Sequence, residues 1–166
     1  MKIELAIGSI TEQPDCDAIV NAANPMLRPG GGVAGAIHRD AGHELAKLCE
    51  QYAPIAVGDA LITPGFNLPN KQVIHVLGPV YFTDPDAEYH LRKAIRSILE
   101  LCQEHSIQKI ALPAISTGSY GYPIEEAAQL ILKELDAWHG PLPTMTRVVV
   151  FDQPAYAVFK NLLEDK

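Results

Sequence analysis

Three consecutive glycines, Gly30, Gly31 and Gly32, open a stretch of helical periodicity and are the first residues whose type and spacing indicate chemistry. Glycine loses the most conformational freedom on folding and gives a core nothing to pack, so such a run makes sense where backbone must approach a ligand closely. The first N–H groups of a helix lack partners within the helix, and the helix dipole adds partial positive charge there. The pattern therefore indicates a site for an anionic ligand such as a phosphate.

A second loop of small, hydroxyl-bearing residues follows an apolar run and leads into another helical pattern. Residues 116–119, Ser-Thr-Gly-Ser, supply hydroxyls and backbone donors, and Tyr120 adds an aromatic ring. Two such loops can hold a diphosphate from both sides while a sugar lies against the ring. Neither loop ends in the Gly-Lys-Ser/Thr of nucleoside triphosphate-binding loops, so triphosphate hydrolysis is not expected.

The elements that must position these loops alternate between strands and helices. Apolar runs predict strands over residues 3–7, 18–22, 73–77, 110–115 and 148–151. Apolar spacings of three and four predict helices over residues 33–51, 87–105, 123–138 and 152–163. This alternation predicts an α/β sandwich with helices on both faces of the sheet. Ligands of such sheets bind at the carboxyl ends of inner strands, where both loops lie.

Length, charge and cysteine usage narrow the class of protein. The 166 residues fit one domain spanning 1–166. A net charge of −7 disfavours nucleic acid as a partner, and any phosphate must be held by local backbone donors. Cys16, Cys49 and Cys102 are too widely spaced for a disulfide framework or a zinc site. No apolar run reaches the roughly 18 residues of a membrane span, and no secretory signal is evident. We therefore expect a cytoplasmic protein without metal or membrane contact.

Three blocks of the chain, in order and covering most of its length, resemble the macrodomain family. The first block comprises residues 17–24 (DAIVNAAN) and 30–38 (GGGVAGAIH), the second residues 67–69 and 73–81, and the third residues 113–123 (PAISTGSYGYP). The likeness is closest to the MacroD-type branch, among Appr-1″-p processing-like proteins. It implies a three-layer α/β/α sandwich with a mixed, largely parallel sheet. The implied partners of this monomer, which needs no cofactor, are ADP-ribose and ADP-ribosylated proteins or O-acetyl-ADP-ribose.

The resemblance also assigns residues to the site. Asn24 matches the asparagine beside the scissile bond at the distal ribose, and it is the expected catalytic residue. The other expected contacts are Gly31, Gly32, Val33 and Ala34 in the first phosphate loop, Ser116, Thr117, Gly118, Ser119 and Tyr120 in the second, and Ser9, Ile10, Phe151 and Asp152 around the adenine.

Two residues depart from the family pattern. Ser9 replaces the usual aspartate that accepts from the adenine amino group, and a neutral acceptor is roughly half as strong as an ionised one, so we expect looser adenine discrimination. Ala34 replaces the aspartate that MacroD-type hydrolases place in the first loop. Losing a positioned general base typically costs about 10²–10⁴-fold in rate. Catalysis would then depend on Asn24 and on water activated by the phosphate of the substrate.

Three functions stay open at the level of sequence. The chain hydrolyses ADP-ribosyl esters, on protein carboxylates or in O-acetyl-ADP-ribose, or it binds ADP-ribose without turnover as a reader or scavenger. The third function, an NAD-dependent oxidoreductase, would use Gly30, Gly32 and Gly35 as G-x-G-x-x-G, but a polar loop separates these glycines from the preceding strand and no strand follows Gln51 directly. His38 and His75 are interpreted as scaffold histidines.

Overall fold

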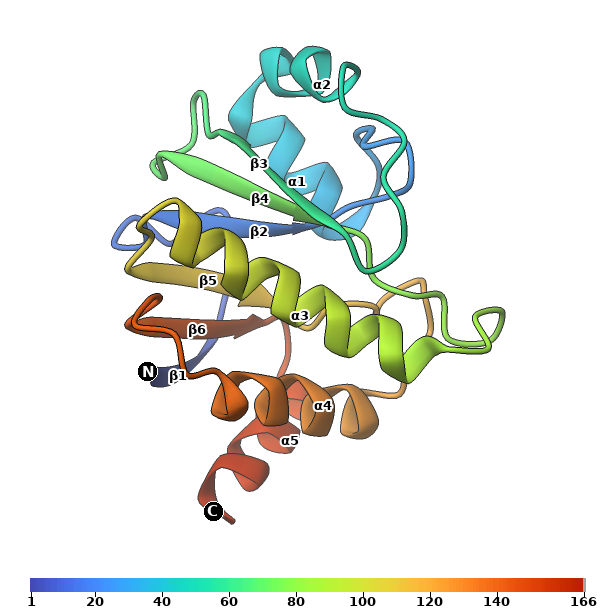
Figure 1. The fold of residues 1–166 in the computed structure, drawn as a ribbon, viewed down its shortest axis with the longest axis vertical. Coiled ribbons are helices and arrows are strands. Elements are labelled where there is room, and N and C mark those ends of the chain that lie inside the picture. Colours follow the sequence, from blue (N-terminus) through green and yellow to red (C-terminus); the bar gives the residue numbers. More distant parts are fainter. Residues whose placement is uncertain (166) are drawn as a thin grey trace.

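The computed structural model describes residues 1–165, and six strands form one sheet in the order β1-β6-β5-β2-β4-β3 (Figure 1). All neighbouring pairs are parallel except β3 and β4, which are antiparallel. The strands are β1 (Lys2–Ile7), β2 (Ala18–Ala22), β3 (Ala60–Pro64), β4 (Gln72–Val76), β5 (Lys109–Pro113) and β6 (Met145–Val150). The helices are α1 (Gly32–Ala41), α2 (His43–Cys49), α3 (Ala87–Glu104), α4 (Ile124–Ala137) and α5 (Gln153–Glu164).

Side chains of the inner strands point alternately to the two faces of the sheet and belong to two hydrophobic clusters, one on each face. On β2, for example, Ala18 and Val20 join one cluster and Ile19 joins the other. Helices α3, α4 and α5 cover the first face, and α1 and α2 cover the second. Figure 1 shows α3 crossing in front of the sheet and α1 behind it. The predicted three-layer α/β/α sandwich with a mixed, largely parallel sheet is confirmed.

The structure corrects two predicted elements. The single helix over residues 33–51 is broken at Gly42, which has φ 93° and ends α1, so that α2 begins at His43. This backbone conformation is open to glycine and strained for other residues, and it outweighs the continuous apolar spacing. The antiparallel edge strand β3 was missed, because its five residues end in a proline and only one edge of the strand is paired.

The ends of several elements also differ from prediction. Strand β5 stops at Pro113, so Ile115 belongs to the loop, and β6 begins at Met145 rather than three residues later. The early part of β6 carries Arg147, which faces the sheet surface that α1 and α2 leave open. Because Arg147 interrupts the apolar run, the sequence pattern did not predict the first half of β6.

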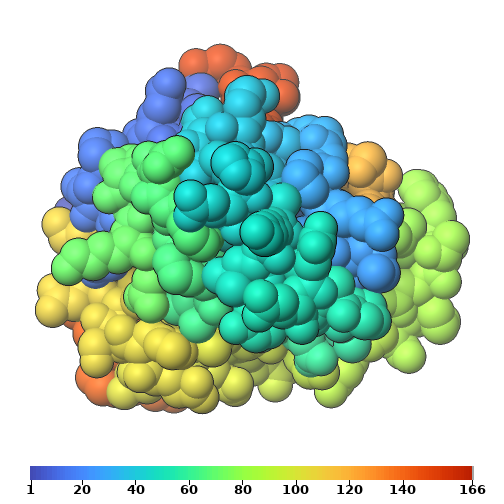
Figure 2. Space-filling model, turned by 90° about the horizontal axis from the view of Figure 1, so that it is seen from above, coloured from blue at the N-terminus to red at the C-terminus, as the bar shows by residue number. Residues whose placement is uncertain are grey.

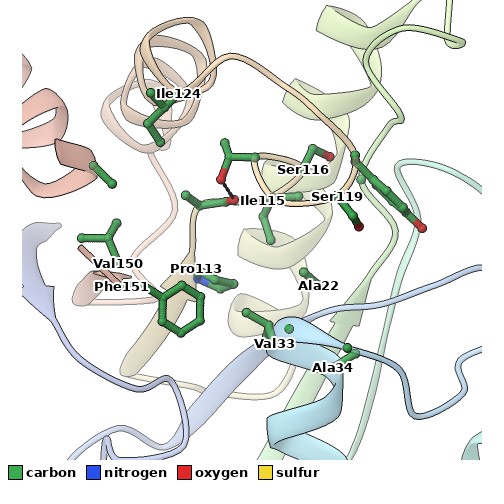
Figure 3. Close-up of a pocket in the computed structure, with 18 of the residues that line it drawn as sticks. Ala22, Val33, Ala34, Pro113, Ile115, Ser116, Ser119, Ile124, Val150 and Phe151 are labelled. Carbon is green, nitrogen blue, oxygen red and sulfur yellow. Dashed lines mark hydrogen bonds between the residues drawn. The ribbon is translucent and has the colours of Figure 1, made fainter. Parts of the chain in front are cut away.

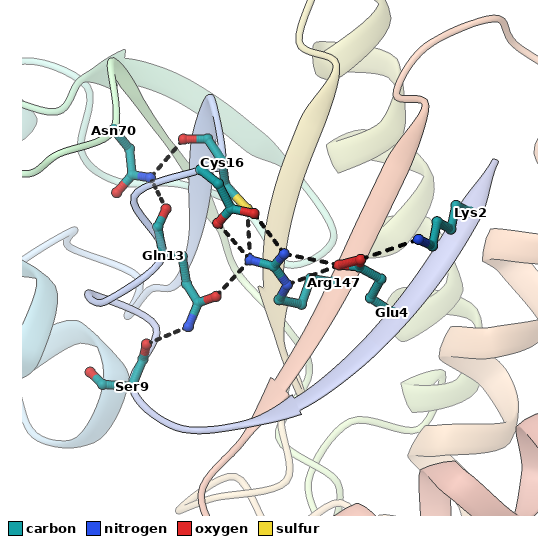
Figure 4. Close-up of polar contacts among 8 residues, drawn as sticks. Lys2, Glu4, Ser9, Gln13, Cys16, Asn70 and Arg147 are labelled. Atoms are coloured by element: carbon teal, nitrogen blue, oxygen red, sulfur yellow. Dashed lines mark hydrogen bonds and ion pairs between the residues drawn. The ribbon is translucent and has the colours of Figure 1, made fainter.

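Arg147 ties β1 and the β1–β2 loop to β6 (Figure 4). Its guanidinium donates to the carboxylates of Glu4 at 2.9 Å and Asp15 at 2.7 Å, and to the side-chain oxygen of Gln13 at 3.0 Å. Hydrogen bonding to Arg147 holds the pKa of Asp15 at about 2, well below its usual value. Gln13 in turn donates to the backbone oxygen of Ser9, so the network fixes the loop that carries Ser9.

The three cysteines are buried and unpaired. Burial raises the pKa of Cys16 and Cys49 to about 11 and that of Cys102 to about 12, which leaves them as inert thiols. Within residues 1–165, no group of three or more His, Cys, Asp or Glu side chains is arranged to hold a metal ion. Within the same range, no helix is long and apolar enough to cross a membrane.

Candidate functional site

A cavity of about 690 Å³ lies at the carboxyl ends of the inner strands and brings both predicted loops together (Figure 3). It runs from the end of β6, past β5 and β2, to Gly78 just beyond β4. The predicted residues that line it are Asn24, Gly31, Gly32, Val33, Ala34, Ser116, Thr117, Gly118, Ser119, Tyr120, Phe151 and Asp152. Asp152 is the only charged residue of the lining, so backbone groups must supply any attraction for an anion.

The first wall of the cavity is the start of α1. Gly31 is the N-cap, no side chain caps the helix, and Gly32 adopts φ 56°, which favours glycine. The N–H groups of the first helical turn therefore have no intrahelical partners and stand beside the cavity. The helix dipole reinforces them as donors to an anion. The close approach of Gly35 to the Gly30 carbonyl leaves no room for a Cβ there, which explains the third glycine of the motif.

The opposite wall is the loop between β5 and α4. Ser116 adopts φ 68° and is 7% exposed, and its buried hydroxyl has no hydrogen-bond partner among the described residues. Across residues 1–165, no hydrogen bond uses the N–H groups of Ser116, Gly118, Ser119 or Tyr120. The loop is braced instead by bonds from Tyr122 N–H to the Ser116 oxygen and from Gly121 N–H to the Gly118 oxygen. A buried hydroxyl and a row of free donors are costly unless a ligand or water satisfies them.

Asn24 lies at the end of the cavity away from β6, and its orientation is fixed. Its amide Nδ2 donates to the Arg28 backbone oxygen at 2.7 Å, and its Oδ1 accepts from the Arg28 N–H at 2.9 Å. These bonds leave one N–H of Nδ2 and one lone pair of Oδ1 for a ligand. Asn24 is thus a preset polar group rather than a flexible loop side chain.

The other end of the cavity, beside β6, is built for a flat apolar group. The ring of Phe151 is 67% exposed and lines the cavity, so it is not a core residue. Asp152 caps α5 by accepting from the Ala155 N–H at 2.9 Å. Figure 3 places Phe151 at one side of the pocket and Ser119 at the other. The lining therefore grades from an aromatic end to a polar end, with the two sets of amides between them.

Ser9 and Ile10 are placed differently from the other predicted residues. Neither belongs to the lining of the cavity. Ile10 is 2% exposed and packs in the hydrophobic cluster beneath α1, and the Ser9 hydroxyl is 2.9 Å from that of Thr11. Their expected contact with an adenine stays a prediction.

Sequence reasoning missed several lining residues, of which Gly78 is the most informative. A Cβ at Gly78 would collide with the Ser116 hydroxyl and press on the Ile115 side chain, so this glycine makes room for the second loop. Its signal in the sequence was its place directly after a predicted inner strand, shared with Ala22 and Ala23. The other missed lining residues are Pro113, Ala114, Ile115, Ile124, Val149, Val150, Pro154 and Ala155.

Both histidines interpreted as scaffold residues are buried behind the first loop. His75 Nδ1 is 3.0 Å from Asn21 Nδ2, and its Nε2 is 2.9 Å from the Thr63 hydroxyl. Because the amide is a donor, Nδ1 accepts and Nε2 carries the proton, which makes His75 neutral. Burial, reinforced by neighbouring His38, lowers the pKa of His75 to about 3. Neither ring lines the cavity, so neither histidine is placed to act as a general base there.

Comparison with known proteins identifies the family. The Macro domain family model matches residues 20–131, which contain Asn24, both glycine-rich loops and Gly78. This chain belongs to the Macro domain family.

Similar proteins narrow the branch. The O-acetyl-ADP-ribose deacetylase of Klebsiella pneumoniae (strain 342) is 41% identical over 96% of this chain and 95% of its own length. The ADP-ribose glycohydrolase MACROD1 of Rattus norvegicus is 47% identical over 82% of this chain, and the match spans about half, 54%, of that longer protein. The Trypanosoma brucei macrodomain solved in complex with ADP-ribose has a TM-score of 0.89 and 36% identity, over 97% of this chain and 68% of that one. These likenesses support the MacroD-type branch.

Proposed function

We propose that this chain binds ADP-ribose across the cavity, with the diphosphate between the two sets of backbone amides. The single observation that carries the proposal is the facing pair of unpartnered donor sets, one at the start of α1 and one made by Ser116 and residues 118–120. The lining between them holds no lysine or arginine among residues 1–165. Neutral donors and a helix dipole attract phosphate whatever the net charge of the chain. The adenine faces Phe151, and the distal ribose lies between Tyr120 and Asn24.

The Trypanosoma brucei macrodomain in complex with ADP-ribose supports this ligand over an intact dinucleotide. The oxidoreductase alternative requires Gly30 to follow a strand at once, but residues 23–29 separate it from β2. It also requires a parallel strand after the helix, whereas β3 is antiparallel. The motif G-x-G-x-x-G therefore does not form the dinucleotide-binding turn in this chain.

Calorimetric titration with ADP-ribose tests the proposal. We expect saturable binding by the native chain and a loss of at least about tenfold in affinity for Gly32→Glu, which puts a carboxylate beside the phosphate site and strains φ. Ser106→Glu is the matched control, because Ser106 has φ 56°, is exposed and precedes β5 at its amino end, away from the cavity at the carboxyl ends of the strands. No saturable heat at millimolar ADP-ribose would reject the proposal.

A second proposed function is slow hydrolysis of ADP-ribosyl esters, favoured by the fixed amide of Asn24 and by the names of the deacetylase and glycohydrolase relatives. Asn24 orients the distal ribose, and a water held by a phosphate oxygen of the substrate attacks the ester. The C–O bond between the ribose and the carboxylic acid then breaks. The products are ADP-ribose and the free carboxylic acid. Asn24→Ala should abolish release of ADP-ribose from a glutamate-modified protein, and equal rates in both proteins would leave binding as the sole function.

Further expectations belong to the same proposal. The chain works as a monomer in the cytoplasm, without cofactor. Its macromolecular partners are ADP-ribosylated proteins rather than nucleic acid, because its net charge of −7 repels polyanions.

A further inference from the structure

A bare aromatic ring stands just outside the polar end of the cavity. Phe82 is 81% exposed and lies in the connection between β4 and α3, which also contains the lining residue Gly78. Figure 2 shows this connection, in yellow-green, projecting beside the orange patch of the second loop. The exposed face of this ring is free to contact a group that leaves the cavity at this end.

The turn that carries Phe82 is held rigidly against the second loop. The Tyr81 N–H donates to the Tyr120 oxygen at 2.9 Å, and the Tyr81 ring packs edge-on against Phe82 with centroids 5.0 Å apart. Behind Phe82, Asp84 accepts from His90 of α3 at 2.6 Å. A Cβ at Gly121 would lie 3.1 Å from the Phe82 ring. The ring is therefore presented from a fixed position, one residue from the hydrogen bond to Tyr120.

The surface around Phe82 is acidic. Asp86, Glu88, Glu125 and Glu126 are exposed at the starts of α3 and α4. Hydrogen bonding to Glu126 raises the pKa of Tyr81, which places this carboxylate beside the aromatic group.

The nearest cations are committed elsewhere. Arg92 and Arg96 bind Glu134 on α4 at 2.6 and 3.3 Å, and Lys93 binds Asp59 at 3.0 Å. The rim of the polar end thus places an exposed aromatic face next to exposed carboxylates, and both attract a cation.

The direction of the cavity indicates what reaches this rim. Its aromatic end lies at β6 and its polar end at Asn24 and Tyr120. In the proposed binding of ADP-ribose, the sugar farthest from the base therefore lies toward β4. Phe82 follows β4 by six residues. Whatever is attached to that sugar leaves the cavity toward Phe82.

We propose that Phe82 and the carboxylates around it bind the polypeptide to which ADP-ribose is attached, and favour segments with a lysine or arginine next to the modified residue. This inference rests on the proposed binding of ADP-ribose and adds a substrate class to it. A cation of the segment lies on the face of Phe82, and its charge is matched by Glu88 and Glu126.

The test uses a peptide ADP-ribosylated on a central glutamine, whose amide linkage resists ester hydrolysis, with either lysines or glutamates as neighbours. The native chain should bind the lysine peptide more tightly than free ADP-ribose, and the glutamate peptide more weakly. Phe82→Ser should weaken the lysine peptide by about 3- to 5-fold, the size of an exposed cation–π contact, and leave free ADP-ribose unchanged within twofold. Phe82→Tyr should restore the binding.

Tyr52→Ser is the matched control, since Tyr52 is 51% exposed on the α2–β3 connection, outside the cavity lining. If Phe82→Ser lost the same affinity for the peptide and for free ADP-ribose, Phe82 would only support the second loop. That result would overturn this inference and leave the proposed function intact. Unchanged peptide affinity would also overturn it. Failure of the native chain to bind free ADP-ribose would instead remove the proposed function, and this inference with it.

Discussion

Asn24 and Ala34 face the same cavity with opposite consequences for chemistry. The amide of Asn24 is locked by two hydrogen bonds to Arg28 and offers its remaining donor and acceptor to a ligand. Ala34, in the first turn of α1, is 6% exposed and adds only a methyl group to the lining. The only carboxylate of the lining, Asp152, lies at the aromatic end and is engaged in capping α5. At the scale of single residues, the site is equipped for binding first and for proton transfer hardly at all.

Restoring a carboxylate at this position should therefore raise turnover. Ala34→Asp should increase release of ADP-ribose from a glutamate-modified protein by at least about tenfold, since a positioned general base contributes about 10²–10⁴-fold. Ala34→Asn, of the same size and uncharged, should give no such gain. Equal rates for the two variants would mean that added polarity, not a base, limits the reaction.

Helix starts are the structural elements that make the site. Both α1 and α5 begin at the cavity, and they are capped differently: α1 leaves its amides free, whereas Asp152 satisfies the amide of Ala155 at the start of α5. The free start suits an anionic ligand, and the capped start is suited to the apolar end beside Phe151. The difference in capping thus distinguishes α1, whose free amides can bind a ligand, from α5, whose start only supports the site.

Removing the cap should be visible in stability. Asp152→Ala should cost about 1 kcal/mol, and so lower Tm by about 2–4 °C in a thermal unfolding experiment. Lys160→Ala, which loses only a 4.0 Å surface ion pair on the same helix, should leave Tm unchanged. A Tm for Asp152→Ala equal to that of the control would show that the cap contributes nothing.

Gly78, two residues beyond β4, makes room for the second loop because it has no side chain. Gly78→Ala should weaken binding of ADP-ribose by about tenfold or more, because the added methyl displaces Ser116 and moves the amides of the loop. Gly8→Ala adds the same methyl into open space and should bind like the native chain. Native-like affinity in Gly78→Ala, measured by calorimetry, would rule out this packing role.

At the scale of the whole molecule, the interior contains a row of hydrogen-bonded polar side chains whose charge depends on pH. Asn21, His75 and Thr63 link β2, β4 and β3 through hydrogen bonds of 3.0 and 2.9 Å. His38, whose pKa burial lowers, faces His75 from α1 without a hydrogen-bond partner of its own among the described residues. The interior therefore holds two neutral histidines whose protonation would place charge between sheet and helix.

This arrangement predicts loss of stability toward acid. The folded pKa of His75, about 3, lies below the 6.5 of an unperturbed histidine, so the unfolded chain alone takes up the proton as pH falls below 6.5. The stabilisation is complete above pH 6.5 and declines toward pH 3, by up to about tenfold in the unfolding equilibrium per pH unit. Urea unfolding at pH 7 and pH 5 should show the decline.

His75→Gln keeps an acceptor for Asn21 and a donor for Thr63, and should flatten the dependence between pH 7 and pH 5. His105→Gln, at an exposed histidine after α3, should retain the native dependence. Identical pH profiles for the native chain and His75→Gln would exclude His75 as the source.

Much of the fold and of the candidate site could be predicted from local patterns. The inner strands, the glycines before α1 and the residues 116–120 were found because each is encoded within a few consecutive residues. Local patterns could not find β3, whose pairing with β4 is decided by the partner strand, nor the break at Gly42, which a continuous apolar spacing hides. Gly78 was missed as a site residue because its reason is a contact with Ser116, 38 positions away in the sequence.

By itself, the sequence determined the layered α/β architecture, the two glycine-containing loops and the resemblance to macrodomains, because periodicity and short motifs are local properties of a chain. Only the tertiary structure decided that the loops face each other with their donors free, that Phe151 is bare while Ile10 is buried, and that Asn24 is locked in place. Only the tertiary structure set Phe82 beside the open end of the cavity. Those features arise where β6, β5, β2 and β4 end side by side, an order in space that no neighbouring residues encode.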